Sequence, residues 1–439
     1  MSLLIKNGRV IDPSSGTDET LDILIDKGKI AEIKTKIDAE EPKIIDASRL
    51  VVAPGFIDMH AHLREPGQED KETISSGALA AAKGGFTTLA CMPNTSPVND
   101  NQGVTEYILS EAKKKAVVNI YPIASITKGQ NGKELVDMAD LIDSGAIAFS
   151  DDGLPVESSD VMRRALEYSK ILNTLIIDHC EDKNLSGKGV MHEGYYSYLF
   201  GMRGIPSSSE ETMVARDIIL AEKANARIHI AHLSVKGATN IVKDAKKKKI
   251  KVTAEVTPHH LFLADSCLEN YETNLKVNPP LRGKEDAKAL IEAIKDGVID
   301  VFATDHAPHT PDEKNVEFDK APFGINGLET AVSLLLDKLV SKNVISLQKF
   351  IKMISTNPAL ILRLENKGKI CVGSDADLTV LNLRKEIVVD VNEFKSKSRN
   401  NPFDGWRLRG APEMTIVGGK IVYPFSSPRK LSKPKGKQK

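Results

Sequence analysis

Histidine and aspartate residues stand at the ends of several apolar segments of this sequence. The first segment, Val51–Met59, leads directly into His60-Ala61-His62. Both histidines face the same way in an extended chain, because side chains alternate along a strand, and two imidazoles one strand step apart can bind one metal ion. Later apolar segments end in residues of the same kinds: Asp151-Asp152, Asp178-His179, His232 and Asp305. The set predicts a zinc centre, with enough ligands for two ions.

The other histidines have simpler interpretations. His229 lies an odd number of residues from His232, so alternation sends the two side chains to opposite sides of a strand. We favour His232 as the ligand because it lies at the strand end, and we expect His229 to be a hydrogen-bonded packing residue. His259-His260 could supply one ligand, although adjacent residues face opposite sides. His192 has no matching partner, and we expect it to be exposed.

The ligand candidates require strands whose ends meet in one place. Apolar strands alternate with amphipathic helical segments between residues 54 and 365, which predicts an α/β fold with a closed (β/α)8 TIM barrel. Strand ends converge on one face of such a barrel, where barrel enzymes keep their active sites. An open doubly wound sheet is the alternative, but no G-x-G-x-x-G follows the first strand. The eight predicted strands are residues 56–59, 87–92, 117–124, 146–149, 175–178, 227–231, 251–256 and 299–303.

Both ends of the chain have the pattern of an antiparallel sheet. Residues 1–53 contain short strands separated by Asn7-Gly8 and Lys27-Gly28, which are hairpin signals. Residues 366–425 contain a strand at 377–383 and a hairpin at 415–422, so we expect the two ends to form one small β-domain. Residues 306–327 form a long connection that we interpret as an active-site loop. The lysine-rich residues 426–439 predict a disordered basic tail.

Composition narrows the class of function. Lys plus Arg and Asp plus Glu both number 60, so no net charge favours nucleic acid or a membrane surface, and we expect a small-molecule partner. The four cysteines, Cys91, Cys180, Cys267 and Cys371, include no C-x-x-C pair. We interpret them as buried thiols in a reducing compartment. No signal-peptide pattern and no run of 18 apolar residues occurs, so we expect a cytoplasmic protein.

Four motifs extend the interpretation to a known family. Between about residue 3 and residue 424 the chain resembles bacterial class I dihydroorotases of the amidohydrolase superfamily, through His60-Ala-His-Leu-Arg-Glu-Pro-Gly67, Met92-Pro-Asn-Thr95, Asn278-Pro-Pro-Leu-Arg282 and Ala303-Thr-Asp-His-Ala-Pro-His309. The resemblance implies a barrel with a β-sandwich domain and two Zn²⁺ ions per subunit. It also implies reversible interconversion of N-carbamoyl-L-aspartate and (S)-dihydroorotate plus water in de novo pyrimidine (UMP) biosynthesis. A homodimer or a complex with aspartate transcarbamoylase would fit the family.

The resemblance also implies a role for each site residue. His60, His62 and Asp305 would hold one ion, His179 and His232 the other, and Asp152 would bridge them. Asp305 would also be the catalytic proton carrier. Many binuclear members of the superfamily use a carboxylated lysine as the bridge, but this chain has no lysine between Lys133 and Lys170. The implied substrate contacts are His62, Arg64, Asn94, Asn278, His309, Phe323 and Gly324.

Arg64 decides between competing functions. It lies two residues past His62, on the same side of the chain, where a guanidinium can bind a substrate carboxylate with two hydrogen bonds. The alternative for Arg64 is a salt bridge at the rim to Glu65 or Glu69. A hydrolase of hydantoin or allantoin would use the same metal chemistry without needing Arg64. A non-catalytic barrel that serves as a structural partner of aspartate transcarbamoylase is the second rival, but an inactive relative should have lost metal ligands, and none is missing from this sequence.

Overall fold

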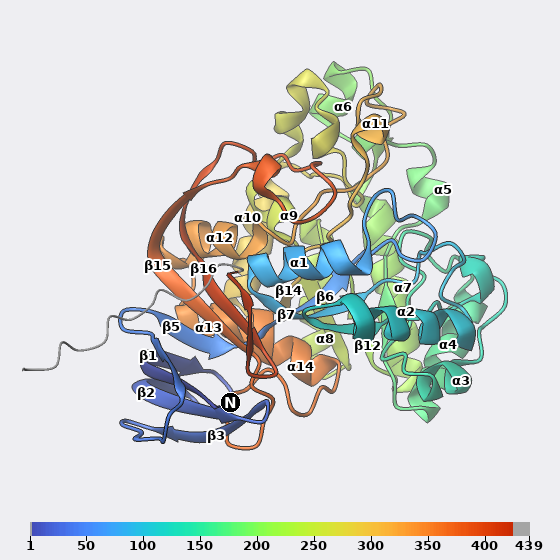
Figure 1. Ribbon diagram of the computed structural model, residues 1–439. Coiled ribbons are helices and arrows are strands. Elements are labelled where there is room, and N and C mark those ends of the chain that lie inside the picture. The colour runs from blue at the N-terminus through green and yellow to red at the C-terminus, as the bar shows by residue number, and fades with distance from the viewer. Residues whose placement is uncertain (1, 425–439) are drawn as a thin grey trace, which may run out of the picture.

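Parallel strands at the centre of the molecule form the predicted barrel. The computed structural model describes residues 2–424, so the predicted tail 426–439 lies outside the described residues. One arc contains three strands and the other contains four, and Figure 1 shows helices packed around them. The strands are β6 (Phe56–Ala61), β7 (Phe86–Cys91), β8 (Asn119–Pro122), β9 (Ile176–Asp178), β12 (Ile228–Ile230), β13 (Val252–Val256) and β14 (Val301–Phe302).

The fourth predicted strand closes the barrel without being a regular strand. Phe149 forms single bridges to Ala124 on one side and Ile176 on the other, and Ala61 forms a bridge to His306 at the other seam. The prediction of a full strand at 146–149 is therefore wrong in detail, although its position is right. The segment is short because the chain turns at once into Asp151, whose carboxylate accepts hydrogen bonds from the amides of Ile126 and Thr127.

Amphipathic helices cover the outside of the barrel, and several begin at a side-chain cap. Thr73 caps α1, Asn101 caps α2 and Ser158 caps α4, each by accepting a backbone N–H of the first turn. The helices between the barrel strands are α1 (Ile74–Gly84), α2 (Gln102–Lys115), α3 (Met138–Asp143), α4 (Ser159–Ile171), α7 (Ser207–Ala224), α8 (Lys236–Lys247) and α10 (Lys284–Lys295). Three short helices, α12 (Ala331–Leu335), α13 (Leu347–Ile351) and α14 (Asn357–Ile361), complete the ring.

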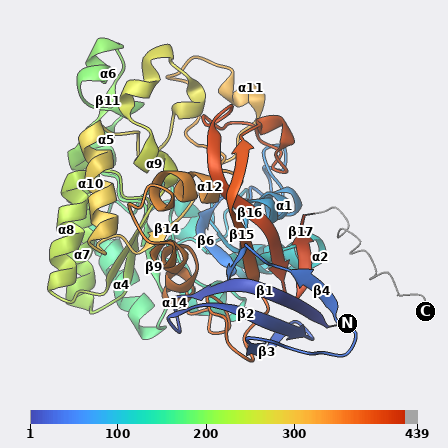
Figure 2. The same ribbon diagram turned by 90° about the vertical axis from the view of Figure 1, so that its left-hand side faces the viewer.

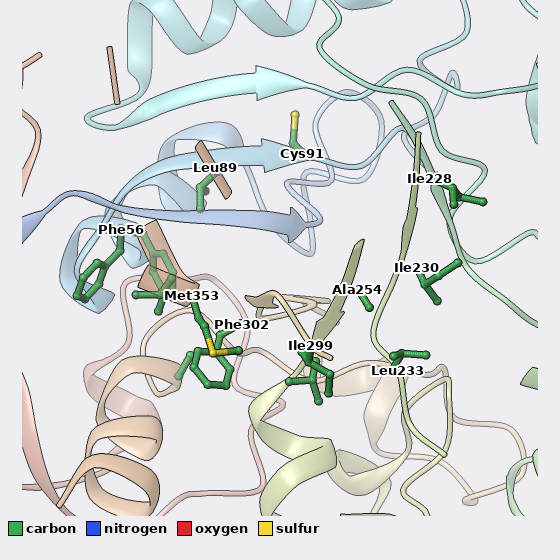
Figure 3. Packing of buried hydrophobic residues seen from close by; sticks show 14 of the residues in the cluster. Phe56, Leu89, Cys91, Ile228, Ile230, Leu233, Ala254, Ile299, Phe302 and Met353 are labelled. Carbon is green, nitrogen blue, oxygen red and sulfur yellow. The ribbon is translucent and has the colours of Figure 1, made fainter. Parts of the chain in front are cut away.

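Large apolar side chains fill the space between the barrel and these helices. Figure 3 shows Phe56, Phe302 and Met353 packed together, and the ring of Phe350 lies edge-on to Phe56 at 5.6 Å between centroids. Removing such surface from water is worth about 25 cal/mol per Å² and is the main force that holds the helices against the strands. The polar residues of the site are therefore carried at the end of a close-packed apolar core.

The two ends of the chain build one eight-stranded sheet beside the barrel, with its N-terminal strands at the bottom of both views and its C-terminal strands above them (Figure 1 and Figure 2). Buried residues from both ends, including Ile5, Ile23, Val52, Val380 and Ile416, share one core. The predicted fold class, a barrel with a β-domain from both chain ends, is confirmed. The strands are β1 (Leu3–Asp12), β2 (Thr17–Asp26), β3 (Lys29–Lys34), β4 (Lys43–Asp46), β5 (Val51–Pro54), β15 (Leu378–Val388), β16 (Arg407–Val417) and β17 (Lys420–Tyr423).

Two details of the sequence interpretation are wrong. Asn7-Gly8 is not a hairpin turn: β1 continues through it, and its pairing with β2 shifts register between Ile5 and Gly8. Asn7 takes a positive φ of 61° there and donates its amide to Asp22, so the signal marks a bulge.

Of the cysteines, Cys91 and Cys180 are buried as predicted, but Cys267 and Cys371 are exposed. Within residues 2–424, no helix is both long enough and apolar enough to cross a membrane.

Gly55 joins the two domains, because β5 belongs to the outer sheet and β6 to the barrel. A Cβ at position 55 would lie 2.2 Å from Oγ1 of Thr87, whose hydroxyl donates to the Phe56 carbonyl. We expect Gly55→Ala to lower the free energy of unfolding by about 1–3 kcal/mol, the usual cost of overpacking. Denaturant unfolding measures the loss. Gly103→Ala, in the first turn of α2 and with its nearest neighbour at 3.4 Å, is the control and should not destabilise.

Candidate metal centre

Four histidines and two aspartates meet at the carboxyl ends of the barrel strands. The Asp152 carboxylate lies at their centre, with Oδ1 3.2 Å from Nε2 of His60 and Oδ2 3.4 Å from Nε2 of His62. Its Oδ1 is also 3.6 Å from Nε2 of His232 and 3.7 Å from Nδ1 of His179. Asp305 approaches from β14, with Oδ1 3.2 Å from Nε2 of His62. All six side chains are buried.

These residues form two groups whose donor atoms are close enough to share an ion. His60, His62 and Asp305 form one group, and His60, Asp152 and His232 form the other. His179 adjoins the second group through Nδ1, which is 2.8 Å from Nε2 of His232. Nε2 of His60 and Oδ1 of Asp152 are buried and have no hydrogen-bond partner among the described residues. Imidazole nitrogens and carboxylate oxygens that converge without hydrogen-bond partners are suitable ligand atoms for a divalent cation.

Hydrogen bonds on the outer side of the cluster decide which ring nitrogen each histidine presents. His60 uses Nδ1 to contact Glu255 at 2.7 Å, and His62 uses Nδ1 to contact Oδ1 of Asn94 at 2.8 Å, so both present Nε2 inward. His179 is reversed, because its Nε2 contacts Glu181 at 3.1 Å and leaves Nδ1 facing the cluster. Such partners fix the tautomer and orientation of a ligating imidazole.

Asp151 and Asp152 are adjacent but have different surroundings. Asp151 points away from the histidines and accepts hydrogen bonds from the backbone amides of Ile126 and Thr127 and from the Thr127 hydroxyl. Asp152 points into the cluster. Gly153 follows with φ of +80°, a left-handed conformation that turns the chain sharply after the aspartate.

The charges of the cluster depend on one another. Burial alone would raise the pKa of Asp152 and Asp305, but the surrounding imidazoles hold the pKa of both carboxyls below its usual range. Burial also acts against a charged His60, yet Asp152 and Glu255 raise the pKa of this histidine well above its ordinary value. The aspartates are therefore deprotonated, as metal ligands must be.

A cavity of about 200 Å³ opens beside the cluster. It is lined by Asp152, His62, His179, His232 and Asp305, whereas His60 is fully buried beneath. The same cavity gathers the residues that the sequence motifs indicated as substrate contacts: Arg64, Asn94, Asn278, His309, Phe323 and Gly324. Segments more than 250 residues apart thus meet at one small polar space.

Arg64 is buried without a carboxylate partner among residues 2–424. Its Nε donates to the carbonyl of Pro308 at 3.3 Å, and only 8% of the residue is exposed. Burial lowers the pKa of Arg64, although nearby carboxylates oppose the shift. The alternative salt bridges are absent: Glu65 accepts from the Ile74 amide and Glu69 from the Gly67 amide. A buried guanidinium with unused donors at a cavity requires an anion there.

The long segment 306–327 supplies the remaining contacts and is fastened from outside the barrel. His309 donates through Nε2 to the Phe323 carbonyl at 2.9 Å. The backbone amide of Gly324 already donates to the backbone carbonyl of Lys276 at 2.8 Å. The amide of Phe323 is therefore the better candidate for a backbone contact with a ligand. Asn400, between β15 and β16, accepts from the His309 amide and donates to the carbonyls of Ala307 and Gly324.

The other histidines fill structural positions. His229 contacts Thr253 through one ring nitrogen and Glu255 through the other, as expected for a packing residue. His260 contacts the Thr257 hydroxyl and the Pro279 carbonyl, and His259 is buried beside it. His192 is half-buried rather than exposed, and its Nδ1 accepts from Arg282 at 3.3 Å.

Sequence reasoning missed Glu255, Glu181 and Asn400. Glu255 is a fully buried charge inside the apolar strand β13, and a lone acidic residue in such a strand was a usable signal. Glu181 follows His179 by two residues, the spacing that places two side chains on one side of an extended chain. Asn400 had no signal, because its partners lie about 75 to 93 residues away along the chain.

Comparison with known proteins agrees with this geometry. Residues 48–238 match a family model described as dihydro-orotase-like, and residues 223–423 match the amidohydrolase family. The chain is 52% identical to the dihydroorotase of Pelotomaculum thermopropionicum, covering 96% of this chain and 98% of the relative. It is 50% identical to the dihydroorotase of Syntrophus aciditrophicus, covering 96% and 99%.

Solved structures of lower identity share the whole fold. L-Hydantoinase (dihydropyrimidinase) from Arthrobacter aurescens superimposes with a TM-score of 0.88 at 26% identity, covering 95% of both chains. A D-hydantoinase superimposes with a TM-score of 0.85 at 26% identity, covering 96% of this chain and 95% of that one. Identity of about half over nearly the full length of curated relatives decides the assignment: this chain belongs to the dihydroorotase family of amidohydrolases.

Proposed function

We propose that this chain is a dihydroorotase that interconverts (S)-dihydroorotate plus water and N-carbamoyl-L-aspartate. The observation that carries the proposal is the buried guanidinium of Arg64, which faces the cavity and has no carboxylate partner within the described part of the chain. Dihydroorotate is a cyclic ureide with a carboxylate, so it supplies the missing anion beside the metal cluster. Sequence identity of 50% to 52% with curated dihydroorotases, over 96% of the chain, supports the same reaction.

The proposed cofactor is a pair of Zn²⁺ ions. His60, His62 and Asp305 would hold one, His179 and His232 the other, and Asp152 would be shared. A bound divalent ion supplies a water activated at neutral pH and polarises a carbonyl oxygen. The nitrogen-rich donor set supports zinc over magnesium or calcium, which prefer oxygen ligands. With Asp152 in the central place, no carboxylated lysine is required.

The residues of the chain have distinct tasks in this reaction. Arg64 and Asn94 grip the substrate carboxylate and so fix the ring carbonyl over the metal cluster. The deprotonated carboxylate of Asp305 takes the proton of the attacking water and returns it to the ring nitrogen that leaves. His309, Asn278 and the Phe323 backbone hold the other polar edges of the ring. In the biosynthetic direction, the same groups act on carbamoyl aspartate in reverse order.

A hydantoinase function is the nearest rival, because solved hydantoinases share the fold. Hydantoin carries no carboxylate, and its binding would leave the Arg64 guanidinium desolvated and unpaired at a cost of several kcal/mol. The protein ligands of the cluster are all present, which argues against a non-catalytic barrel. The homodimer and the complex with aspartate transcarbamoylase stay predictions, as does a cytoplasmic location.

The substrate assignment is tested by removing the guanidinium. Arg64→Met should lower kcat/KM for dihydroorotate by about 10²-fold or more, because a charged bidentate contact is lost. Activity on dihydrouracil, which lacks the carboxylate, should be low in the native protein and should change little. Steady-state kinetics with both substrates measure the preference, and Arg163→Met on the exposed face of α4 is the control. Equal turnover of the two substrates by the native protein would show the assignment to be wrong.

The proton-carrier role is tested at Asp305. Asp305→Asn keeps an oxygen that can face the metal but cannot accept a proton, so kcat should fall by about 10²- to 10⁴-fold while part of the metal is retained. Metal content and single-turnover rates are measured on the same preparation. Near-normal turnover in this variant would assign the proton transfer to His309 or to solvent instead.

The two adjacent aspartates should differ in what their loss removes. Asp152→Ala should release metal, because the central carboxylate of the cluster is gone. Asp151→Ala should keep metal but lower the melting temperature, since the buried amides of Ile126 and Thr127 lose their acceptor at about 1–3 kcal/mol each. Elemental analysis after gel filtration and thermal unfolding separate the two effects. The reverse pattern would mean that Asp151 is the ligand.

A further inference from the structure

One buried carboxylate oxygen connects the metal cluster with the substrate side of the cavity. Oε2 of Glu181 accepts hydrogen bonds from Nε2 of His179 at 3.1 Å and from Nδ2 of Asn278 at 2.8 Å. It is also 2.5 Å from Nζ of Lys183. Glu181 is 6% exposed, so these three donors replace the water that a carboxylate would otherwise require.

The contact with His179 determines how that residue faces the cluster. Because Nε2 contacts the carboxylate of Glu181, Nδ1 is the ring nitrogen that faces the cluster, 2.8 Å from Nε2 of His232. His60, His62 and His232 all turn Nε2 towards Asp152 instead. The reversed ring of His179 therefore depends on a partner in its own loop, two residues further along the chain.

The contact with Asn278 joins two loops. Glu181 follows β9, whereas Asn278 lies in the loop after β13, and the strand between them, β12, leads to His232. Nδ2 of Asn278 also lies 3.3 Å from Nε2 of His179, a close approach of two donors that both face the carboxylate of Glu181. The carboxylate of Glu181 therefore contacts both the candidate metal ligand and the amide that lines the cavity, so a movement of either side chain would change the position of the carboxylate.

We propose that Glu181 is a positioning residue that couples the metal ligand His179 to the substrate contact Asn278, so that metal and substrate each bind more tightly when the other is present. The proposal rests on the proposed function for the nature of the substrate. Coupling between two sites is reciprocal, so it can be measured from either side. The simpler alternative is a local ion pair between Glu181 and Lys183 that only stabilises the loop.

The experiment measures zinc affinity by competition with a chromogenic chelator, with and without saturating orotate. Orotate has the same ring carboxylate as dihydroorotate, and binding can be measured without turnover. In Glu181→Gln we expect zinc affinity without orotate to fall about 10- to 100-fold, because a neutral amide oxygen is a weaker acceptor for the ligating histidine than a carboxylate. The factor by which orotate tightens zinc binding should also fall, by about fivefold or more.

Three further variants separate coupling from loop stability. Lys183→Met removes the ion pair alone and should leave the orotate effect intact. Asn278→Ala should keep native zinc affinity without orotate but show a smaller orotate effect, measured at orotate concentrations that saturate this variant, and it tests the proposal even if Glu181→Gln does not fold. Glu222→Gln, at an exposed position on α7, is the matched control for loss of a carboxylate.

The outcomes divide clearly. Unchanged zinc affinity in Glu181→Gln, or an unchanged orotate effect in both Glu181→Gln and Asn278→Ala, would overturn the proposal. Loss of the orotate effect in Lys183→Met as well would assign the effect to loop stability and would also overturn it. A native protein that binds zinc and orotate but does not hydrolyse dihydroorotate would reject the proposed function while leaving the coupling measurement valid.

Discussion

The buried carboxylate of Asp152, surrounded by four imidazoles at 3.2 to 3.7 Å, is the constraint that the rest of the structure must satisfy. Bringing these groups out of water is costly, because each loses hydration and the imidazole nitrogens crowd one another. A cation between them offsets that cost, and carboxylates on the outer side, Glu255 and Glu181, help to hold the rings in place. The backbone that carries these side chains must therefore be rigid.

The barrel provides this rigid support, and its fourth strand is irregular next to the position where Asp152 enters the cluster. Residues 146–149 make only bridges through Phe149, and the chain then turns at Gly153. This turn brings Asp152 to the centre of the histidine cluster. Asp151 stabilises the turn by accepting hydrogen bonds from two backbone amides in the loop after the neighbouring strand β8. A longer regular strand would carry the aspartate past the cluster. The irregularity is therefore part of how the site is built.

The sequence predicted what local pattern and strand alternation determine. His60-x-His62 on one face, the preference for His232 over His229 and the eight-fold repetition of strand and helix all follow from short-range periodicity. The prediction at Asn7-Gly8 was wrong because the residue types that favour a hairpin turn also favour a bulge. Pairing with β2 and the close approach of Gly8 to Val52 decide between the two, and neither can be seen in the local sequence. The role of Asn400 could not be predicted from the sequence, since its three side-chain hydrogen bonds to segment 306–327 depend on where the outer sheet packs.

The candidate metal ligands and the candidate substrate contacts lie on different parts of the barrel. The candidate metal ligands lie on or directly after barrel strands, which are fixed by backbone hydrogen bonds, and solved hydantoinases share this fold at 26% identity. Arg64, Asn278, His309 and Phe323 lie in loops, where side chains can change without disturbing the barrel. The choice of substrate must therefore be argued from the loops. Arg64 is the decisive residue among them, because no carboxylate of residues 2–424 pairs with its buried charge at the wall of the cavity.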